Sequence, residues 1–181
     1  MSSGRSGNWE AARRHRDVAE LDAEALLAAL VGRDVEFVVI GGLALAVHGF
    51  VRATKDLDVV PRPERENRER LFAALEAVHA RPIETDDFRP EELPVPFDVE
   101  GLELGGNWAL WTAAGRLDVL QWVSGVEGYG QLRANALTVP VPDVGTVLVA
   151  GYDDLIAMKR AAGRRQDLQD VAALEELRES G

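Results

Sequence analysis

Two spacings of hydrophobic residues alternate along the first half of the chain. Apolar residues recur on one helical face in residues 21–31 and 65–79, which predicts two amphipathic helices. Residues 35–40 form a short apolar run with three valines and an isoleucine, a composition typical of a buried strand. One or two helical turns are predicted at 43–48, and residues 57–60 predict a second short strand that is closed by prolines.

Short apolar runs separated by glycine turns dominate the second half. Each of these runs predicts a strand: 99–104, 108–112, 116–123, 137–141 and 146–149. Two helices are predicted after them, at 153–162 and 166–177, with Gly163 between them. The prolines and acidic residues of 81–96 predict a loop or a weak edge strand, and 125–130 is predicted to be a loop.

This order of elements predicts a mixed α/β (α+β) domain, in which a sheet is flanked by helices. A chain of 181 residues is long enough for one such domain. We expect the domain to span residues 21–181 and to include C-terminal helices within 153–178. Residues 1–20 are expected to form a flexible or helical segment ahead of it.

Composition and charge predict a cytoplasmic protein that has no membrane partner. The chain has no cysteine, and its longest apolar stretch, residues 37–47, is shorter than the ~20 residues that a bilayer requires. The formal net charge of −11 repels nucleic acid unless positive charge gathers locally. Such charge gathers in one short segment, at Lys159, Arg160, Arg164 and Arg165.

A Gly41–Gly42 pair lies where the first predicted strand meets a predicted helix. Glycine lets backbone N–H groups approach a ligand closely, and a helix N-terminus carries partial positive charge, so such a turn can hold phosphates. The pair can equally serve only the geometry of the turn. It matches neither the Walker motif nor the dinucleotide-binding glycine motif.

Asp56 and Asp58 lie two residues apart in the second predicted strand, so their side chains share one face. Their Cα atoms are then about 6.6 Å apart. Two carboxylates at that separation repel each other by roughly 3 kcal/mol at an effective dielectric constant near 20. A bound cation would offset this repulsion, and so would an exposed, hydrated strand face.

Asp118 lies in the most strand-like segment of the second half, with Leu120 and Trp122 on the same face. A carboxylate on an apolar face costs several kcal/mol unless it has a partner. Pairing with Arg116 or Arg52 is one solution. The other is a shared site with the two earlier aspartates, an oxygen-only set of the kind that Mg²⁺ takes with substrate phosphates.

Taken together, residues 40–42, the Asp56-Leu57-Asp58 motif and the Asp118 strand resemble the nucleotidyltransferase superfamily. Its pattern is a hydrophobic residue, Gly-Gly or Gly-Ser, a spacer, Asp-x-Asp and a later third acid. The stretch 40–58, with His48-Gly49, Arg52 and Thr54 inside it, looks like the small bacterial nucleotidyltransferases grouped with AbiEii-type toxins. The resemblance implies a nucleotidyltransferase-like mixed sheet.

Two further positions bear on this resemblance. Residues 154–171 are similar to the helical signature of the AbiEii-type group, which contains a lysine at the position of Lys159. Gly42 stands where many polymerase-like members have a serine that contacts phosphate, and the Gly-Gly form is usual in the toxin-like branch.

The resemblance implies metal-dependent transfer of a nucleoside monophosphate from an NTP to an acceptor, with Mg²⁺ or Mn²⁺ as the metal. Asp56 and Asp58 would hold two ions, and Asp118 would hold the ion nearer the acceptor and take its proton. The nucleotide-binding residues implied are Gly41, Gly42, Arg52, Thr54, Lys159 and Arg164.

Several alternatives stay open at this level. Asp167 and Asp170 can lie near the metal, but an i,i+3 acidic pair near Arg164 and Arg165 more simply forms ion pairs on a helix surface. The acceptor can be RNA such as tRNA, a protein or a small molecule, and the protein can belong to a toxin–antitoxin pair. A catalytically inactive nucleotide-binding antitoxin or regulatory partner is the main alternative, and a hydrolase is a third. The chain can act alone, as a homodimer or with a protein from a neighbouring gene.

Overall fold

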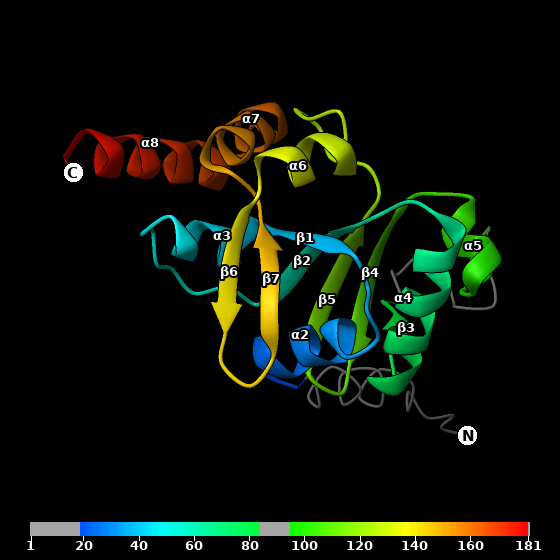
Figure 1. Cartoon of the computed structure of the whole chain (residues 1–181). Helices are drawn as coiled ribbons and strands as arrows, with labels where there is room; N and C mark the ends of the chain where they lie inside the picture. Colours follow the sequence, from blue (N-terminus) through cyan, green and yellow to red (C-terminus); the bar gives the residue numbers. More distant parts are fainter. Residues whose placement is uncertain (1–18, 84–94, 181) are drawn as a thin grey trace, which may run out of the picture.

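A seven-stranded mixed sheet forms the centre of the molecule (Figure 1). The computed structural model describes residues 19–83 and 95–180, and within them the strand order is β3-β4-β5-β2-β1-β7-β6. The strands are β1 Phe37–Ile40, β2 Asp56–Pro61, β3 Arg81–Pro82, β4 Asn107–Thr112, β5 Gly115–Leu120, β6 Leu137–Val141 and β7 Gly145–Val149. The predicted mixed α/β class is confirmed.

Helices cover this sheet in two groups. The helices of the described residues are α2 Ala23–Val31, α3 Gly41–Val47, α4 Arg65–Ala77, α5 Val99–Glu103, α6 Tyr129–Asn135, α7 Tyr152–Ala162 and α8 Arg165–Ser180. Helices α2 and α4 contact each other and the central strand β2. Helix α7 packs against α8 and contacts α3, and Figure 1 shows α7 and α8 together at one end of the sheet.

The strand register brings distant parts of the chain together at the centre of the sheet. Strand β2 pairs antiparallel with β1 and parallel with β5. In the parallel pair Asp58 lies opposite Asp118, and in the antiparallel pair Ile40 lies opposite Asp58. Because Ile40 is the last residue of β1, the glycine turn that follows begins beside the same aspartate.

Side-chain alternation separates a core face from an acidic face on β2 and β5. Leu57 and Val59 of β2, with Leu117 and Val119 of β5, are at most 1% exposed. Each such side chain contributes roughly 1.5–3 kcal/mol by leaving water. Since successive strand residues point to opposite faces, this burial fixes the direction of the aspartates between them.

Residues 99–104 were expected to form a strand, and this prediction is wrong. Val99–Glu103 is the helix α5, because the Asp98 side chain accepts a 2.7 Å hydrogen bond from the Gly101 N–H and caps the first turn. Leu102 of this helix is buried in the core. Two glycines in the left-handed region, Gly105 and Gly106, end the segment.

The loop predicted at 125–130 is shorter than expected, because α6 begins at Tyr129 and buries Leu132. Of the predicted segment 81–96, only the short strand β3 and the residues from 95 onward are described. The predicted N-terminal segment, residues 1–20, lies almost wholly outside the described residues. None of the helices described is both long and apolar enough to cross a membrane.

Candidate metal and nucleotide site

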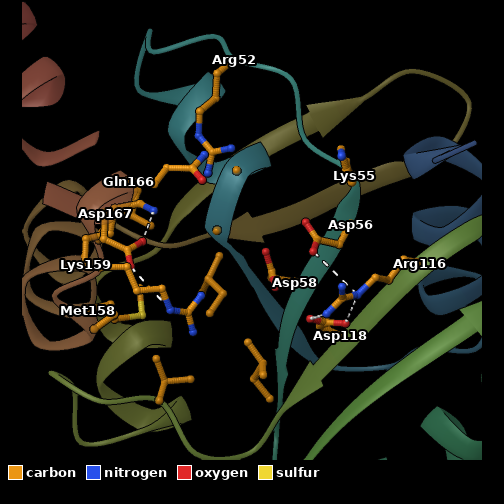
Figure 2. A pocket seen from close by; sticks show the side chains of 18 of the residues that line it. Arg52, Lys55, Asp56, Asp58, Arg116, Asp118, Met158, Lys159, Gln166 and Asp167 are labelled. Atoms are coloured by element: carbon orange, nitrogen blue, oxygen red, sulfur yellow. Dashed lines mark hydrogen bonds and ion pairs between the residues drawn. The ribbon is translucent and has the colours of Figure 1, made fainter. Parts of the chain in front are cut away.

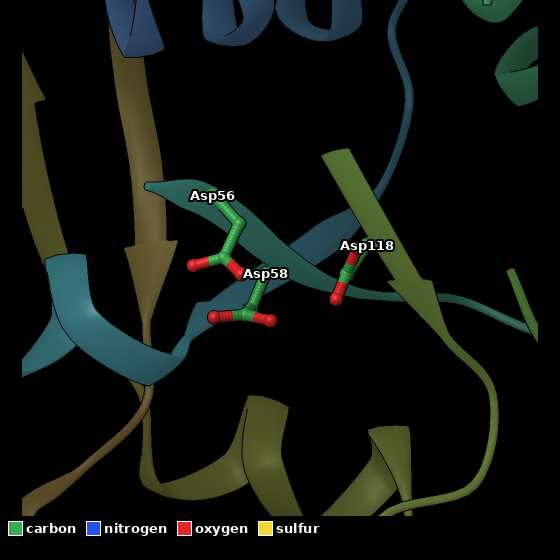
Figure 3. Close-up of side chains that lie close together, drawn as sticks. All are labelled: Asp56, Asp58 and Asp118. Atoms are coloured by element: carbon green, nitrogen blue, oxygen red, sulfur yellow. The ribbon is translucent and has the colours of Figure 1, made fainter. Parts of the chain in front are cut away.

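Three aspartate side chains converge on one point at the centre of the sheet (Figure 3). Asp56 and Asp58 project from β2 and Asp118 projects from the neighbouring β5. One carboxylate oxygen from each lies within 4.8 Å of the other two. We call these three residues the acidic triad. The structure therefore brings together the three carboxylates that the sequence predicted to share a site.

Burial and repulsion within the triad both disfavour the ionised form of Asp58. At 4.8 Å, two unit charges repel by roughly 3 kcal/mol at an effective dielectric constant of 20. The pKa of Asp58 is raised from 3.8 to about 7, first by burial and then by the neighbouring charges of Asp56 and Asp118. Ionisation of Asp58 is thus costly in the protein alone.

Arg116 offsets part of this repulsion. Its Nε and Nη2 donate hydrogen bonds of 2.9 and 2.8 Å to the two oxygens of Asp118, and its Nε lies 3.8 Å from Asp56. The hydrogen bond to Asp118 raises the pKa of Arg116, so the guanidinium stays charged. The sequence left two alternatives for Asp118, pairing with an arginine or clustering with the other two aspartates. In the structure Asp118 does both.

The Gly41–Gly42 turn approaches the triad so closely that side chains are excluded. Gly41 has φ +67°, and a Cβ there would overlap Oδ2 of Asp58. A Cβ on Gly42 would lie 2.6 Å from Oγ1 of Thr54. The Thr54 hydroxyl in turn donates to Asp56, at 3.1 Å from its backbone oxygen and 3.3 Å from Oδ1. Gly41 is therefore required by its left-handed backbone and by Asp58, and Gly42 by the close approach of Thr54.

The triad and the turn line a cavity of about 620 Å³ (Figure 2). Its polar lining contains eight of the nine predicted site residues, namely Gly41, Gly42, Arg52, Asp56, Asp58, Asp118, Lys159 and Arg164. Thr54, the ninth, lies behind Gly42 and outside the lining. Apolar side chains complete the walls, among them Leu120, Val123, Leu155 and Met158.

A buried ion-pair network holds two of the predicted phosphate-binding cations. Lys159 Nζ lies 2.7 Å from Asp170 and 3.1 Å from Asp167, and Arg52 Nε lies 3.2 Å from Asp170. The Asp170 side chain is only 3% exposed. Arg164, by contrast, is 84% exposed and reaches Asp167 only at 3.9 Å.

The prediction that Asp167 and Asp170 form ion pairs on a helix surface near Arg164 and Arg165 is confirmed only for the 3.9 Å pair between Arg164 and Asp167, and it is wrong about the surface, since both aspartates are largely buried. Helix α8 packs against α7, so this face of α8 turns inward and meets Lys159 of α7. The sequence showed the spacing of the two aspartates, but not which helix would pack against them.

Four further polar residues line the cavity that the sequence did not assign to the site: Lys55, Arg116, Gln166 and Asp167. A signal existed for the first two, since Lys55 directly precedes the Asp-x-Asp motif and Arg116 shares a strand face with Asp118. Gln166 at the start of α8 had no such signal.

The donor set of the triad fits a hard divalent cation. Three carboxylates supply oxygen ligands alone, the chemistry that Mg²⁺ and Mn²⁺ prefer. Burial, together with the charges of Asp56 and Asp118, raises the pKa of Asp58 by more than Arg116 and Lys159 lower it. A cation at this position would favour the ionised form of all three carboxylates.

The fold is shared with solved structures of a nucleotidyltransferase. No protein-family model matches this sequence, and no curated protein matches it. The solution structure of the antibiotic-resistance factor ANT(2″)-Ia matches with a TM-score of 0.50 at 15% identity, over 86% of each chain. The crystal structure of ANT(2″)-Ia in complex with adenylyl-2″-tobramycin matches with a TM-score of 0.51 at 15% identity, over 86% of this chain and 92% of that one. The chain thus has a nucleotidyltransferase-like fold.

Replacing Gly41 with alanine is expected to damage the site and the fold. The new Cβ requires a left-handed backbone and overlaps Asp58, so we expect the free energy of unfolding to fall by about 1–3 kcal/mol. Denaturant unfolding measures this change. Gly130→Ala is the matched control, because a Cβ at Gly130 meets nothing within 4 Å. Equal stability of Gly41→Ala and wild type would contradict the close approach.

Asp58 should make the metal-free protein less stable as pH rises. A carboxyl whose pKa is raised to about 7 binds its proton more tightly when folded, so the free energy of unfolding falls between about pH 4 and pH 7. In EDTA, Asp58→Asn should flatten this slope and be on the order of 2 kcal/mol more stable than wild type at pH 8. Urea unfolding at pH 5 and pH 8 tests this, with the exposed Asp143→Asn as control. An unchanged slope in Asp58→Asn would refute it.

Proposed function

We propose that this protein is a metal-dependent nucleotidyltransferase that moves a nucleoside monophosphate from an NTP to an acceptor hydroxyl. The acidic triad carries the proposal, since its three carboxylate oxygens meet within 4.8 Å in a cavity that also contains the glycine turn. The nucleotidyltransferase-like fold supports it. Retaining three mutually repelling carboxylates would have no benefit for a protein that binds no cation there.

The reaction is an in-line displacement at the α-phosphorus. A bond forms from the acceptor oxygen to this phosphorus, the bond to the bridging oxygen breaks, and pyrophosphate leaves with the electron pair. Divalent cations held by Asp56, Asp58 and Asp118 would neutralise the charge on the phosphoryl oxygens. A carboxylate oxygen of Asp118 would take the proton of the acceptor hydroxyl.

The chain's own donors would hold the triphosphate. Backbone N–H groups at Gly41 and Gly42 open helix α3 beside the triad and would face the phosphates. Lys159 and Arg52 are kept in place by Asp170, so they would meet the nucleotide with little loss of side-chain entropy. Arg164 is exposed at the rim and would reach outer phosphate oxygens, while Thr54 would act by fixing Asp56.

The proposal also covers the acceptor and the biological role. The structural neighbour ANT(2″)-Ia was solved with adenylyl-2″-tobramycin, which is an acceptor already carrying its nucleotide. For this chain RNA, a protein and a small molecule remain the acceptor classes. The AbiEii-like sequence pattern supports a cytoplasmic role in a toxin–antitoxin pair, with a neighbouring-gene protein or a second copy as partner.

Asp118→Asn is expected to abolish nucleotide transfer while leaving the fold intact. The protein is incubated with each α-³²P-labelled NTP, Mg²⁺ or Mn²⁺, and cell extract, and labelled products are separated. Loss of one carboxylate from the triad should lower label transfer by about 100-fold or more. Asp143→Asn, which also removes one negative charge but lies outside the cavity, should transfer as wild type does.

The same experiment separates the two leading functions. Metal-dependent label transfer by wild type supports the transferase. Binding of NTP by wild type without transfer to any component of the extract would instead support an inactive nucleotide-binding antitoxin or regulatory protein. Undiminished transfer by Asp118→Asn would contradict the shared site.

A further inference from the structure

A buried carboxylate at the start of α7 takes no part in the site described so far. Asp154 is 4% exposed and lies in the first turn of the helix that carries Lys159. Within residues 19–83 and 95–180 it forms no ion pair, and its interactions there are hydrogen bonds to amide side chains. Burying a carboxylate is costly unless its oxygens are well satisfied. These hydrogen bonds must therefore supply much of the compensation.

Both hydrogen-bond donors to Asp154 come from α6. Gln131 Nε2 donates to Oδ1 at 2.6 Å, and Asn135 Nδ2 donates to Oδ2 at 3.1 Å. Because both donors are NH₂ groups, both oxygens of Asp154 accept, as those of an ionised carboxylate do. Such charge-assisted hydrogen bonds are stronger than bonds between neutral groups. We call Asp154, Gln131 and Asn135 the α6–α7 clamp.

The clamp also reaches residues 121–128, which connect β5 to α6. Gln131 Oε1 accepts a 2.8 Å hydrogen bond from the Glu127 N–H. Gly125 has φ +91°, and a Cβ there would lie 2.4 Å from the carbonyl oxygen of Ala157, so the connecting backbone lies directly against α7. The connecting residues, α6 and α7 therefore pack as one unit.

This unit forms one wall of the cavity. Its side chains in the cavity lining are Val123, Leu155, Met158, Lys159 and Ala162. Asp154 itself is not part of the lining. Lys159 follows it by five residues, about 7.5 Å along the helix at a rise of 1.5 Å per residue. Because the first turn and Lys159 belong to one continuous helix, a displacement of the first turn would move the wall as well.

Stabilisation of the helix N-terminus does not account for Asp154. The neighbouring Asp153 also lies in the first turn of α7 and already places negative charge there. Asp153 is exposed, and its ion pair with Arg178 is 3.6 Å long. The two aspartates therefore share position and charge but differ in burial and in partners.

We propose that Asp154 is a positioning residue for the nucleotide. By clamping α7 to α6 it sets the place of Lys159 and of the apolar wall against the bound nucleotide, without contacting nucleotide or metal itself. This inference rests on the proposed transferase function and deepens it, since it assigns control of nucleotide binding to a residue outside the cavity.

Binding of a non-hydrolysable nucleotide tests the role of Asp154 without any need for turnover. Isothermal titration calorimetry in Mg²⁺ would use the α,β-methylene analogues of ATP, GTP, CTP and UTP. In Asp154→Asn an NH₂ group replaces one oxygen and faces an NH₂ donor of α6, so one hydrogen bond of the clamp is lost. We expect the Kd of the analogue that wild type binds to rise by about tenfold.

A double variant tests whether the hydrogen bonds themselves matter. Asp154→Asn combined with Gln131→Glu exchanges the amide and the carboxylate and keeps the net charge. The carboxylate at position 131 can accept from the amide at position 154 and from the Glu127 N–H, while the amide oxygen at position 154 still accepts from Asn135. The double variant should bind within about threefold of wild type, whereas Gln131→Glu alone should weaken binding, because it sets two carboxylates against each other.

Two control variants separate positioning from charge and from general stability. Asp153→Asn removes the same charge from the same helical turn and should bind as wild type does. Asn67→Ala deletes a buried amide of α4 that bonds to the backbone of Glu36 and Arg62, outside the cavity lining. It should lower the free energy of unfolding and leave the Kd of the analogue unchanged.

Four results would overturn the proposal: wild type binds none of the analogues, Asp154→Asn binds as wild type does, the double variant binds no better than Asp154→Asn, or Asn67→Ala weakens binding equally. If Asp154→Asn does not fold, the double variant decides, since it must fold and bind as wild type does.

Failure of the transferase function has a different signature. In that case label transfer is missing in every extract, while the Kd values still follow the expected pattern. Label transfer by wild type together with an unchanged Kd in Asp154→Asn would overturn the positioning role alone.

Discussion

The mutual repulsion of three carboxylates is the constraint on which the site depends. Asp56, Asp58 and Asp118 would separate if they were free to move, and the sheet prevents this. The parallel register sets Asp58 opposite Asp118, and the burial of Leu57 and Leu117 on the other face keeps both strands in that register. Apolar packing in the hydrophobic core thereby holds an electrostatically unfavourable cluster in place.

The surroundings of the triad accommodate it in three ways, two of which relieve repulsion and one of which provides space. Arg116 forms a two-bond pair with Asp118. Asp58, with its pKa raised to about 7, can keep a proton near neutral pH when no cation is present. The Gly41 turn has no side chain and leaves the Asp58 carboxylate the space it occupies. The remaining imbalance is what a divalent cation would correct.

Much of the fold and of the site could be predicted because the relevant signals are local. The alternation of apolar residues in β2 and β5 fixed which face the aspartates would occupy, and the glycine pair marked the turn. Helix α5 was missed because its apolar residues resemble a short strand, and its capping residue Asp98 lies outside the run. A capping side chain competes well with hydrophobic pattern in so short a segment.

Other parts of the site depend on packing between elements, which a single sequence does not encode locally. The spacing of Asp167 and Asp170 predicted surface ion pairs, whereas the packing of α8 on α7 turned them toward Lys159. Lys55 was not assigned to the site because a lone lysine ordinarily faces solvent, and it is indeed exposed where it lines the cavity. Its place in the cavity becomes apparent only once the triad, the turn and the C-terminal helices are assembled.

Locating Mn²⁺ in a crystal grown with a non-hydrolysable NTP analogue would test the central claim most directly. The account predicts an anomalous scattering peak bounded by carboxylate oxygens of Asp56, Asp58 and Asp118, with the triphosphate lying along the Gly41–Gly42 turn. Manganese bound elsewhere, with the triad still paired only to Arg116, would contradict the assignment of these carboxylates as the metal site.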